Sequence, residues 1–142
     1  KEEGEWNSWY LNGKLSDKGH FTGGAMDGKW QGWYENGNPK YDGSWIKDNR
    51  TGSWKFYHEN GRLREEGFYM DGEKSGVWRK YDDAQGLESE GSFIEGKPDG
   101  KWVYYYPGGA IWKEQQFKAG RLNGVSTEYN RRNGIIKKVH YK

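Results

Sequence analysis

The sequence predicts an all-β fold, an elongated single-layer antiparallel β-meander built from six β-hairpin repeats of 24 residues. The first observation behind this prediction is a glycine that returns every 24 residues, as Gly4, Gly28, Gly52, Gly76, Gly100 and Gly124. The others are aromatic residues at fixed repeat positions and a turn signal midway through each repeat. The predicted repeats span residues 4–27, 28–51, 52–75, 76–99, 100–123 and 124–142, so 4–142 should form one repeat array.

The composition favours a thin sheet held together by rings. Hydrophobic residues make up only 32% of the chain and the mean hydropathy is −1.30, which is too polar for a thick two-layer core. Aromatic residues reach 18%, the opposite of a disordered composition. The chain has no cysteine, which excludes disulfides and thiolate chemistry. The net charge is +2 with both signs interspersed, so no nucleic-acid partner is expected.

The first strand of each repeat carries two rings. A tryptophan follows the leading glycine by two residues in five repeats, as Trp6, Trp30, Trp54, Trp78 and Trp102, and Ser126 replaces it in the sixth. A second ring follows the glycine by five residues, as Trp9, Trp33, Tyr57, Tyr81, Tyr105 and Tyr129. Because an odd number of residues separates them, the two rings should point to opposite faces of the sheet.

The turn within each hairpin is marked by Asn-Gly. The pairs Asn12-Gly13, Asn36-Gly37 and Asn60-Gly61 predict a two-residue type I′ turn, with positive φ at both residues. In repeats four and six, "YDDAQG" and "YNRRNG" have one more residue before this glycine, which predicts a longer loop or a bulge.

The second strand supplies a glycine for the tryptophan. A two-residue turn makes Tyr57 face Arg64 and places Trp54 opposite Gly67, so each indole should lie flat on the glycine of its own hairpin. The glycines at this position are Gly19, Gly43, Gly67 and Gly91, and Gln115 replaces them in repeat five. A third set of rings, such as Tyr69 and Phe93, should complete a ladder on the tryptophan face.

The ends of the chain give two further expectations. Ser126, Val139 and the "KKVHYK" tail indicate that the sixth repeat caps an edge strand. The chain starts at Lys1 rather than Met, which favours an exported protein, periplasmic or on the cell surface, over a cytoplasmic one.

The unit is carried by "GKWQGWYENGNPKYDGSW", "GSWKFYHENGRLREEGFY" and "GVWRKYDDAQGLESEGSF". It resembles the MORN repeat superfamily, and most of all the bacterial MORN repeat variant of YwqK-like antitoxin proteins. The resemblance covers nearly all of residues 4–142. It implies a single-layer β-meander that serves as a binding platform or spacer for proteins or phospholipid surfaces, without shared catalytic residues.

The sequence offers no catalytic or metal-binding constellation. His20, His58 and His140 are scattered, and no turn has the ordered oxygen ligands of a calcium site. No serine stands in a nucleophile elbow and no glycine-rich loop precedes a helix. We therefore predict a protein that is not an enzyme and uses no cofactor or metal.

Rings that the repeat does not require are the candidate binding residues. Repeat five concentrates them in "KWVYYYPGGAIWKEQQF", where the predicted register makes Tyr106 face Ile111 and Tyr104 face Lys113. The partner-binding candidates are Tyr104, Tyr106, Ile111, Trp112, Tyr34 and Tyr10. We expect a non-catalytic repeat scaffold, suited to be a subunit of a larger complex, that binds another protein through the aromatic face of its sheet. Binding to a membrane surface or anionic lipid, and antitoxin-like neutralisation of a toxin, stay open as alternatives.

Overall fold

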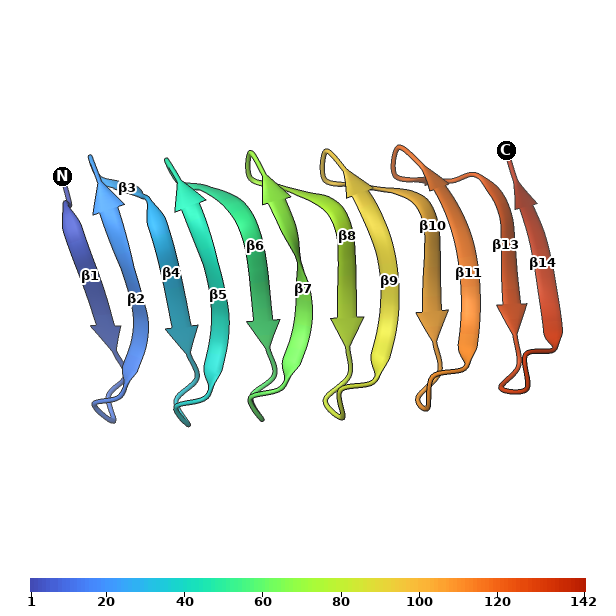
Figure 1. Cartoon of the computed structure of the whole chain (residues 1–142), viewed down its shortest axis with the longest axis horizontal. Coiled ribbons are helices and arrows are strands. Elements are labelled where there is room, and N and C mark those ends of the chain that lie inside the picture. The colour runs from blue at the N-terminus through green and yellow to red at the C-terminus, as the bar shows by residue number, and fades with distance from the viewer.

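The computed structural model describes residues 1–142 and consists of strands, turns and loops. All strands form one open antiparallel sheet in which each long strand neighbours the next along the chain, with the two termini at opposite ends (Figure 1). No second layer covers either face. The structure has no helix long and apolar enough to cross a membrane. The predicted all-β, single-layer meander is confirmed.

Six hairpins account for the twelve strands on the main path of the sheet. Hairpins one to three are β1 (Gly4–Trp9) with β2 (Leu15–Thr22), β4 (Gly28–Trp33) with β5 (Pro39–Ile46), and β6 (Asn49–Tyr57) with β7 (Leu63–Met70). Hairpins four to six are β8 (Glu73–Tyr81) with β9 (Leu87–Ile94), β10 (Lys97–Tyr105) with β11 (Ile111–Lys118), and β13 (Gly124–Tyr129) with β14 (Ile135–Tyr141). Two short strands, β3 (Ala25–Met26) and β12 (Arg121–Leu122), pair beside the turns that join hairpins.

The hairpin loops have three residues, so the predicted type I′ turn is wrong. In hairpin three the His58 N–H donates to the Arg62 carbonyl (2.8 Å), and the Gly61 N–H donates to the His58 carbonyl (2.9 Å). Gly61 has a φ of 87°, whereas Asn60 does not have a positive φ. This pattern fits a type I turn followed by one left-handed residue, the usual three-residue hairpin connection.

The longer loop moves the register near the turn and leaves it unchanged further away. Tyr57 pairs with Leu63 and not with Arg64, because a bulge lies between Phe56 and Tyr57 and leaves Arg64 without a pairing partner. One additional loop residue and one bulged residue cancel. The predicted pairing of Trp54 with Gly67 is therefore confirmed.

Hairpins four and six use the same loop length as the others. Gln85 (φ 71°) and Asn133 (φ 63°) occupy the left-handed position that Gly61 holds in hairpin three. Tyr81 pairs with Leu87, as Tyr57 pairs with Leu63. The prediction of a longer loop in these repeats is wrong, since their glycine has only moved one position past the left-handed residue.

In hairpins two to five, the ladder tryptophan packs on the glycine of the preceding hairpin, not on the glycine of its own. A Cβ atom added at Gly67 would overlap the indole of Trp78, and one added at Gly43 would overlap the indole of Trp54. Trp54 and Gly67 are backbone partners, but the indole of Trp54 leans away towards β5. The same arrangement places Trp30 on Gly19 and Trp102 on Gly91. The indole therefore bridges two hairpins.

A hydrogen bond fixes each of these indoles. The Trp78 Nε1–H donates to the carbonyl of Phe68, the residue after Gly67 (3.0 Å). The corresponding bonds run from Trp30 to His20, from Trp54 to Ser44 and from Trp102 to Ser92. Gly19, Gly43, Gly67 and Gly91 thus allow a close approach, and the next carbonyl sets its direction.

One geometric relation connects the two exceptions in the repeat. Gln115 occupies the place where an indole from hairpin six would need a glycine, and Ser126 occupies the place of that indole. Ser126 is buried without a ring. Loss of the glycine in hairpin five is therefore matched by loss of the tryptophan in hairpin six.

The core is a row of rings on the tryptophan face, which we call the aromatic face. Tryptophan rings from the first strand of each hairpin alternate along this row with rings from the second strand, and neighbouring rings make edge-to-face contacts. The ring centroids are 5.0 Å apart for Tyr69 and Trp78, and 5.1 Å apart for Phe93 and Trp102. The contacts run from Trp6 to Trp30, and again from Trp45 to Phe117. The predicted ladder is confirmed over these stretches.

The opposite face holds the second set of rings. The Tyr81 hydroxyl donates to the Glu66 carboxylate (2.8 Å), and burial followed by this hydrogen bond raises the pKa of Tyr81 to about 12. Tyr129 makes the same contact with Glu114 (2.7 Å). Glu66 precedes Gly67 along β7 and so lies on the other face, as the alternation of the strand requires.

Replacing a buried ladder indole should destabilise the sheet much more than replacing an exposed one at the same repeat position. Trp54 is 1% exposed and Trp6 is 36% exposed. We expect Trp54→Ala to lower the free energy of unfolding by about 3–5 kcal/mol, and Trp6→Ala by less than half as much. Urea unfolding followed by circular dichroism measures both. Similar losses for the two variants would contradict the proposed packing.

The matched exceptions can be tested by building the missing contact. Ser126→Trp alone should destabilise by about 1–3 kcal/mol, because the new indole meets the side chain of Gln115. Combined with Gln115→Gly, the same substitution should recover that loss or more. A double-mutant cycle in urea gives the coupling free energy. A coupling near zero would show that the two positions do not share one contact.

Candidate functional site

Three of the predicted binding residues, Tyr10, Tyr34 and Tyr106, join neighbouring hairpins. Each donates its hydroxyl to a backbone carbonyl 23 residues later, Tyr10 to Trp33 (2.6 Å), Tyr34 to Tyr57 (2.6 Å) and Tyr106 to Tyr129 (2.8 Å). The His58 Nε2 takes the same place against the Tyr81 carbonyl (2.9 Å). These side chains share one repeat position, so the tyrosines are part of the repeat, and the prediction that the repeat does not require them is wrong.

The loop asparagines make a second set of ties. The Asn36 Nδ2 donates to the Glu59 carbonyl of the next loop (2.8 Å), while its Oδ1 accepts from the Asn38 N–H (2.9 Å). Asn12 and Asn60 do the same in hairpins one and three. The asparagine is therefore explained by its side chain, which connects loops, and not by a positive φ.

Both sets of ties are missing between hairpins four and five. Asp82 stands in the place of the tyrosines and accepts from the Ala84 and Gly86 N–H groups of its own loop (2.9 and 2.8 Å). Ala84 stands in the place of the asparagine and has no polar side chain. Hairpins four and five are therefore joined by the pairing of β9 with β10, without a side-chain tie between their loops.

Tyr104, Tyr106 and Trp112 form a cluster on hairpin five. The Trp112 ring centroid lies 6.1 Å from that of Tyr104 and 6.3 Å from that of Tyr106. Trp112 is 39% exposed and is the bulged residue of β11, since Tyr104 pairs with Lys113 and Tyr105 with Ile111. The Lys113 ammonium lies 4.5 Å from the Trp112 ring and 4.7 Å from the Tyr104 ring.

The predicted strand pairing around the cluster is correct for Tyr104 and wrong for Ile111 and Tyr106. Ile111 pairs with Tyr105, so the predicted Tyr106–Ile111 pair is wrong, and the same bulge that exposes Trp112 explains the shift. Tyr106 lies instead opposite Ala110, to which its N–H donates (2.8 Å). The Tyr104–Lys113 pair is confirmed.

Tyr10 and Tyr34 lie apart from the cluster, at the loop edge of the first three hairpins. They line a hollow together with Glu35, Asn36 and Glu59. Burial first, and then the negative charges of nearby carboxylates including Glu35, raise the pKa of Tyr10. The six candidate residues therefore fall into separate places, and the acidic rim of this hollow differs from the basic surroundings of Trp112.

A hollow of about 220 Å³ opens on the aromatic face beside Tyr104. Beside Trp54, the rings of Tyr41 and Phe56 face each other across β5 and β6, with centroids 6.1 and 5.7 Å from the indole. Beside Trp102, Tyr104 occupies the repeat position of Phe56, and Ser89, at the repeat position of Tyr41, supplies no second ring. The hollow lies over Ser89, between hairpins four and five, and is lined also by Lys80, Trp78 and Phe93.

Some of the charged side chains beside the hollow form ion pairs and others do not. Lys74 binds Glu65 (2.9 Å) and covers the Trp78 ring at 4.4 Å. Lys80 and Lys113 form no ion pair. Burial raises the pKa of the Tyr104 hydroxyl, so this ring stays neutral. Two unpaired cations therefore lie on either side of an aromatic surface.

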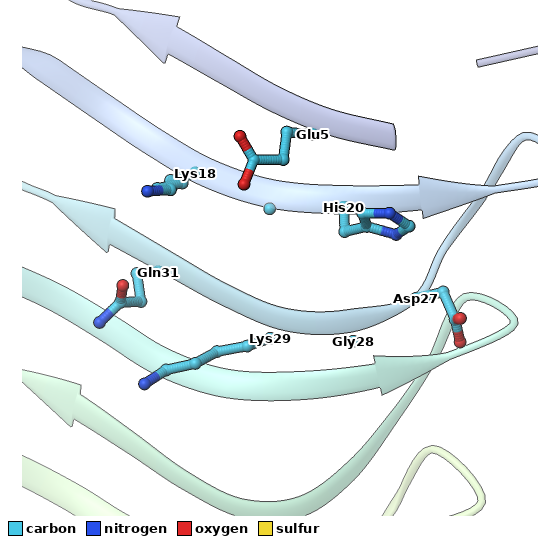
Figure 2. Close-up of a pocket in the computed structure, with 8 residues that line it drawn as sticks. Glu5, Lys18, His20, Asp27, Gly28, Lys29 and Gln31 are labelled. Carbon is cyan, nitrogen blue, oxygen red and sulfur yellow. The ribbon is translucent and has the colours of Figure 1, made fainter. Parts of the chain in front are cut away.

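The opposite face carries a cavity at hairpins one and two that no hydrophobic residue lines. Figure 2 shows Lys18, Lys29, Gln31 and Asp27 spread along the strands instead of pointing to one centre. No group of three or more histidine or acidic residues is placed to hold a metal ion anywhere in the chain. His20 lines this cavity, far along the chain from His58 and His140.

A family model, described as the MORN repeat variant, matches residues 2–22, 26–47, 50–71 and 98–119. The chain belongs to this family. The matches fall on hairpins one, two, three and five, and together they cover more than half of the chain. No curated protein matches the chain. MORN repeats are a non-enzymatic repeat type that typically binds proteins or membranes. The narrower resemblance to YwqK-like antitoxins rests on the sequence pattern alone.

Tyrosine hydroxyls that donate to the next hairpin should contribute to stability, and the hydroxyl of Tyr104 in the hollow should not. We expect Tyr34→Phe and Tyr106→Phe each to lower the free energy of unfolding by about 0.5–1.5 kcal/mol, because a carbonyl of the next hairpin loses its donor. Tyr104→Phe is the matched control, since its hydroxyl makes no hydrogen bond within the protein. Thermal and urea unfolding measure the three variants, and a Tyr104→Phe loss as large as the others would contradict the assignment.

Proposed function

We propose that the protein is a non-catalytic repeat scaffold that binds another protein through the aromatic face of hairpins four and five. The observation that carries this proposal is the cluster of Tyr104, Tyr106 and Trp112, which adds rings beyond the ladder and leaves an indole 39% exposed. Exposed tryptophan and tyrosine side chains are the residues that most often dominate protein interfaces.

The size and chemistry of the hollow support a protein partner. Pockets that bury small molecules are usually about 300–1,000 Å³, whereas this hollow is about 220 Å³. It suits one side chain of a partner that also covers the neighbouring Trp112. The rest of the sheet then acts as a rigid spacer that holds this surface in place, as expected of a subunit in a larger complex.

Two other partners make different demands on the same sheet. Binding to an anionic membrane usually requires clustered Lys and Arg, whereas both charge signs are interspersed along this chain. Neutralisation of a toxin would be one instance of protein binding, and only the identity of the partner distinguishes it. The proposed function therefore specifies the binding surface and does not name the partner protein.

The test is affinity capture of the tagged protein from its source cells, followed by mass spectrometry of proteins recovered in stoichiometric amount. Trp112→Ala should reduce recovery of that partner by about tenfold or more, the loss expected for an interface hot spot, with little change in stability. Trp9→Ala, which removes an indole 61% exposed on hairpin one, is the control and should leave recovery unchanged.

Liposome flotation supplies the opposing measurement. Flotation with anionic vesicles, together with no stoichiometric protein partner, would overturn the proposed function and favour membrane binding. A partner whose recovery is unaffected by Trp112→Ala would move the binding surface elsewhere on the sheet.

A further inference from the structure

We propose that the hollow beside Tyr104 binds an extended acidic segment of the partner, with carboxylates at residues i and i+4 and an apolar ring at i+2. The ring would lie over Ser89 against Trp102, and the carboxylates would meet Lys80 and Lys113. This inference rests on the proposed function and names the chemistry of the partner.

Hairpin two shows how a second-strand ring can lie beside a ladder indole. One ring from the second strand of hairpin two, Tyr41, stacks on Trp54 with an interplanar angle of 17°. Ser89 occupies the same repeat position next to Trp102 and supplies no ring. Tyr41 lies flat on Gly32, and Lys80 takes the place of Gly32 opposite Ser89, so a ring over Ser89 has to approach from above the sheet. An aromatic side chain of a partner in that position would contact Trp102 and bury apolar surface that is left open here.

The two unpaired lysines lie in one row with the hollow. Lys80 pairs with Ser89, Ser89 pairs with Tyr104, and Tyr104 pairs with Lys113 across β8, β9, β10 and β11. Strands are about 4.8 Å apart, so three spacings separate the two lysine positions by about 14 Å. The hollow therefore has a cation on each side, along a line that crosses the strands.

This spacing matches an extended chain laid across the sheet. At about 3.3 Å per residue, positions i and i+4 are about 13 Å apart, and the side chains at i, i+2 and i+4 point to the same side. Two carboxylates and the ring between them therefore meet the two lysines and the hollow together.

The surrounding charges favour an acidic segment. Glu65 lies near Lys80 across β7 and β8, but its carboxylate is bound by Lys74. Glu128 lies across from Lys113 on β13 without forming an ion pair with it. Lys80 and Lys113 are thus free to pair with carboxylates of a partner, and a basic segment would be repelled.

The test uses the full chain and three fluorescein-labelled peptides, each with one phenylalanine among serines and two further residues that are glutamate or glutamine. The first peptide has the order Glu-Ser-Phe-Ser-Glu, the second has glutamine in place of both glutamates, and the third has the two glutamates side by side. Fluorescence anisotropy gives the affinities. We expect the first peptide to bind at least tenfold more tightly than the second and more tightly than the third, with the difference from the second shrinking as salt is added.

The decisive variant is Ser89→Tyr, which places a ring in the hollow over Ser89. It should reduce binding of the first peptide at least tenfold while urea unfolding stays unchanged or shifts to higher denaturant. Lys80→Gln and Lys113→Gln should each weaken binding severalfold. Lys55→Gln removes an exposed lysine on the opposite face and is the matched control.

Three results would overturn the inference, and each distinguishes its failure from failure of the proposed function. Equal binding of the glutamate and glutamine peptides would exclude the carboxylate recognition. A captured partner that is lost with Trp112→Ala but kept with Ser89→Tyr and both lysine variants would preserve the proposed function and reject this site. Anionic vesicles that bind with the same sensitivity to Ser89→Tyr, when no peptide binds, would assign the hollow to a lipid headgroup.

Discussion

The contact between an indole and the glycine of the preceding hairpin is the interaction on which the rest of this sheet depends. A sheet one layer thick has no second layer to bury its apolar surface, and an isolated hairpin is at best marginally stable. Trp54 solves this by lying on Gly43 of its neighbour and donating to the next carbonyl. Stability is therefore a property of each junction between hairpins, as in other repeat proteins.

The candidate site lies where this regular packing is relaxed. Ser89 places a small side chain beside Trp102, and the absence of an indole in hairpin six leaves that side of the ladder more open. The same region gains Trp112 at a bulge and keeps two lysines without ion pairs. Surface for a partner thus arises from departures from the repeat, in a chain whose regular positions are occupied by self-packing.

Fold and long-range register could be predicted because they follow from spacing alone. The Trp54–Gly67 pairing was correct even with the wrong turn, since the third loop residue and the bulge cancel. The direction of the indole could not be predicted, because the pattern places backbones and not side-chain torsions. The tie made by Tyr34 was missed because it joins different repeats. Trp112 can be singled out from the sequence because a large ring stands out from the pattern, whereas the hollow over the small side chain of Ser89 appears only in the structure.

The missing ties between the fourth and fifth loops have a mechanical consequence. At the opposite edge, backbone hydrogen bonds join successive turns, as from the Gly120 N–H to the Pro98 carbonyl (2.9 Å). Side-chain hydrogen bonds also join hairpins one to four at the loop edge. Hairpin five is held to hairpin four at that edge by strand pairing alone. The loop edge of this junction therefore lacks the side-chain hydrogen bonds that join hairpins one to four, and a rotation of hairpin five about the β9–β10 pairing would change the width of the hollow over Ser89. Curvature of the whole array and occupation of one small hollow are in this way mechanically linked.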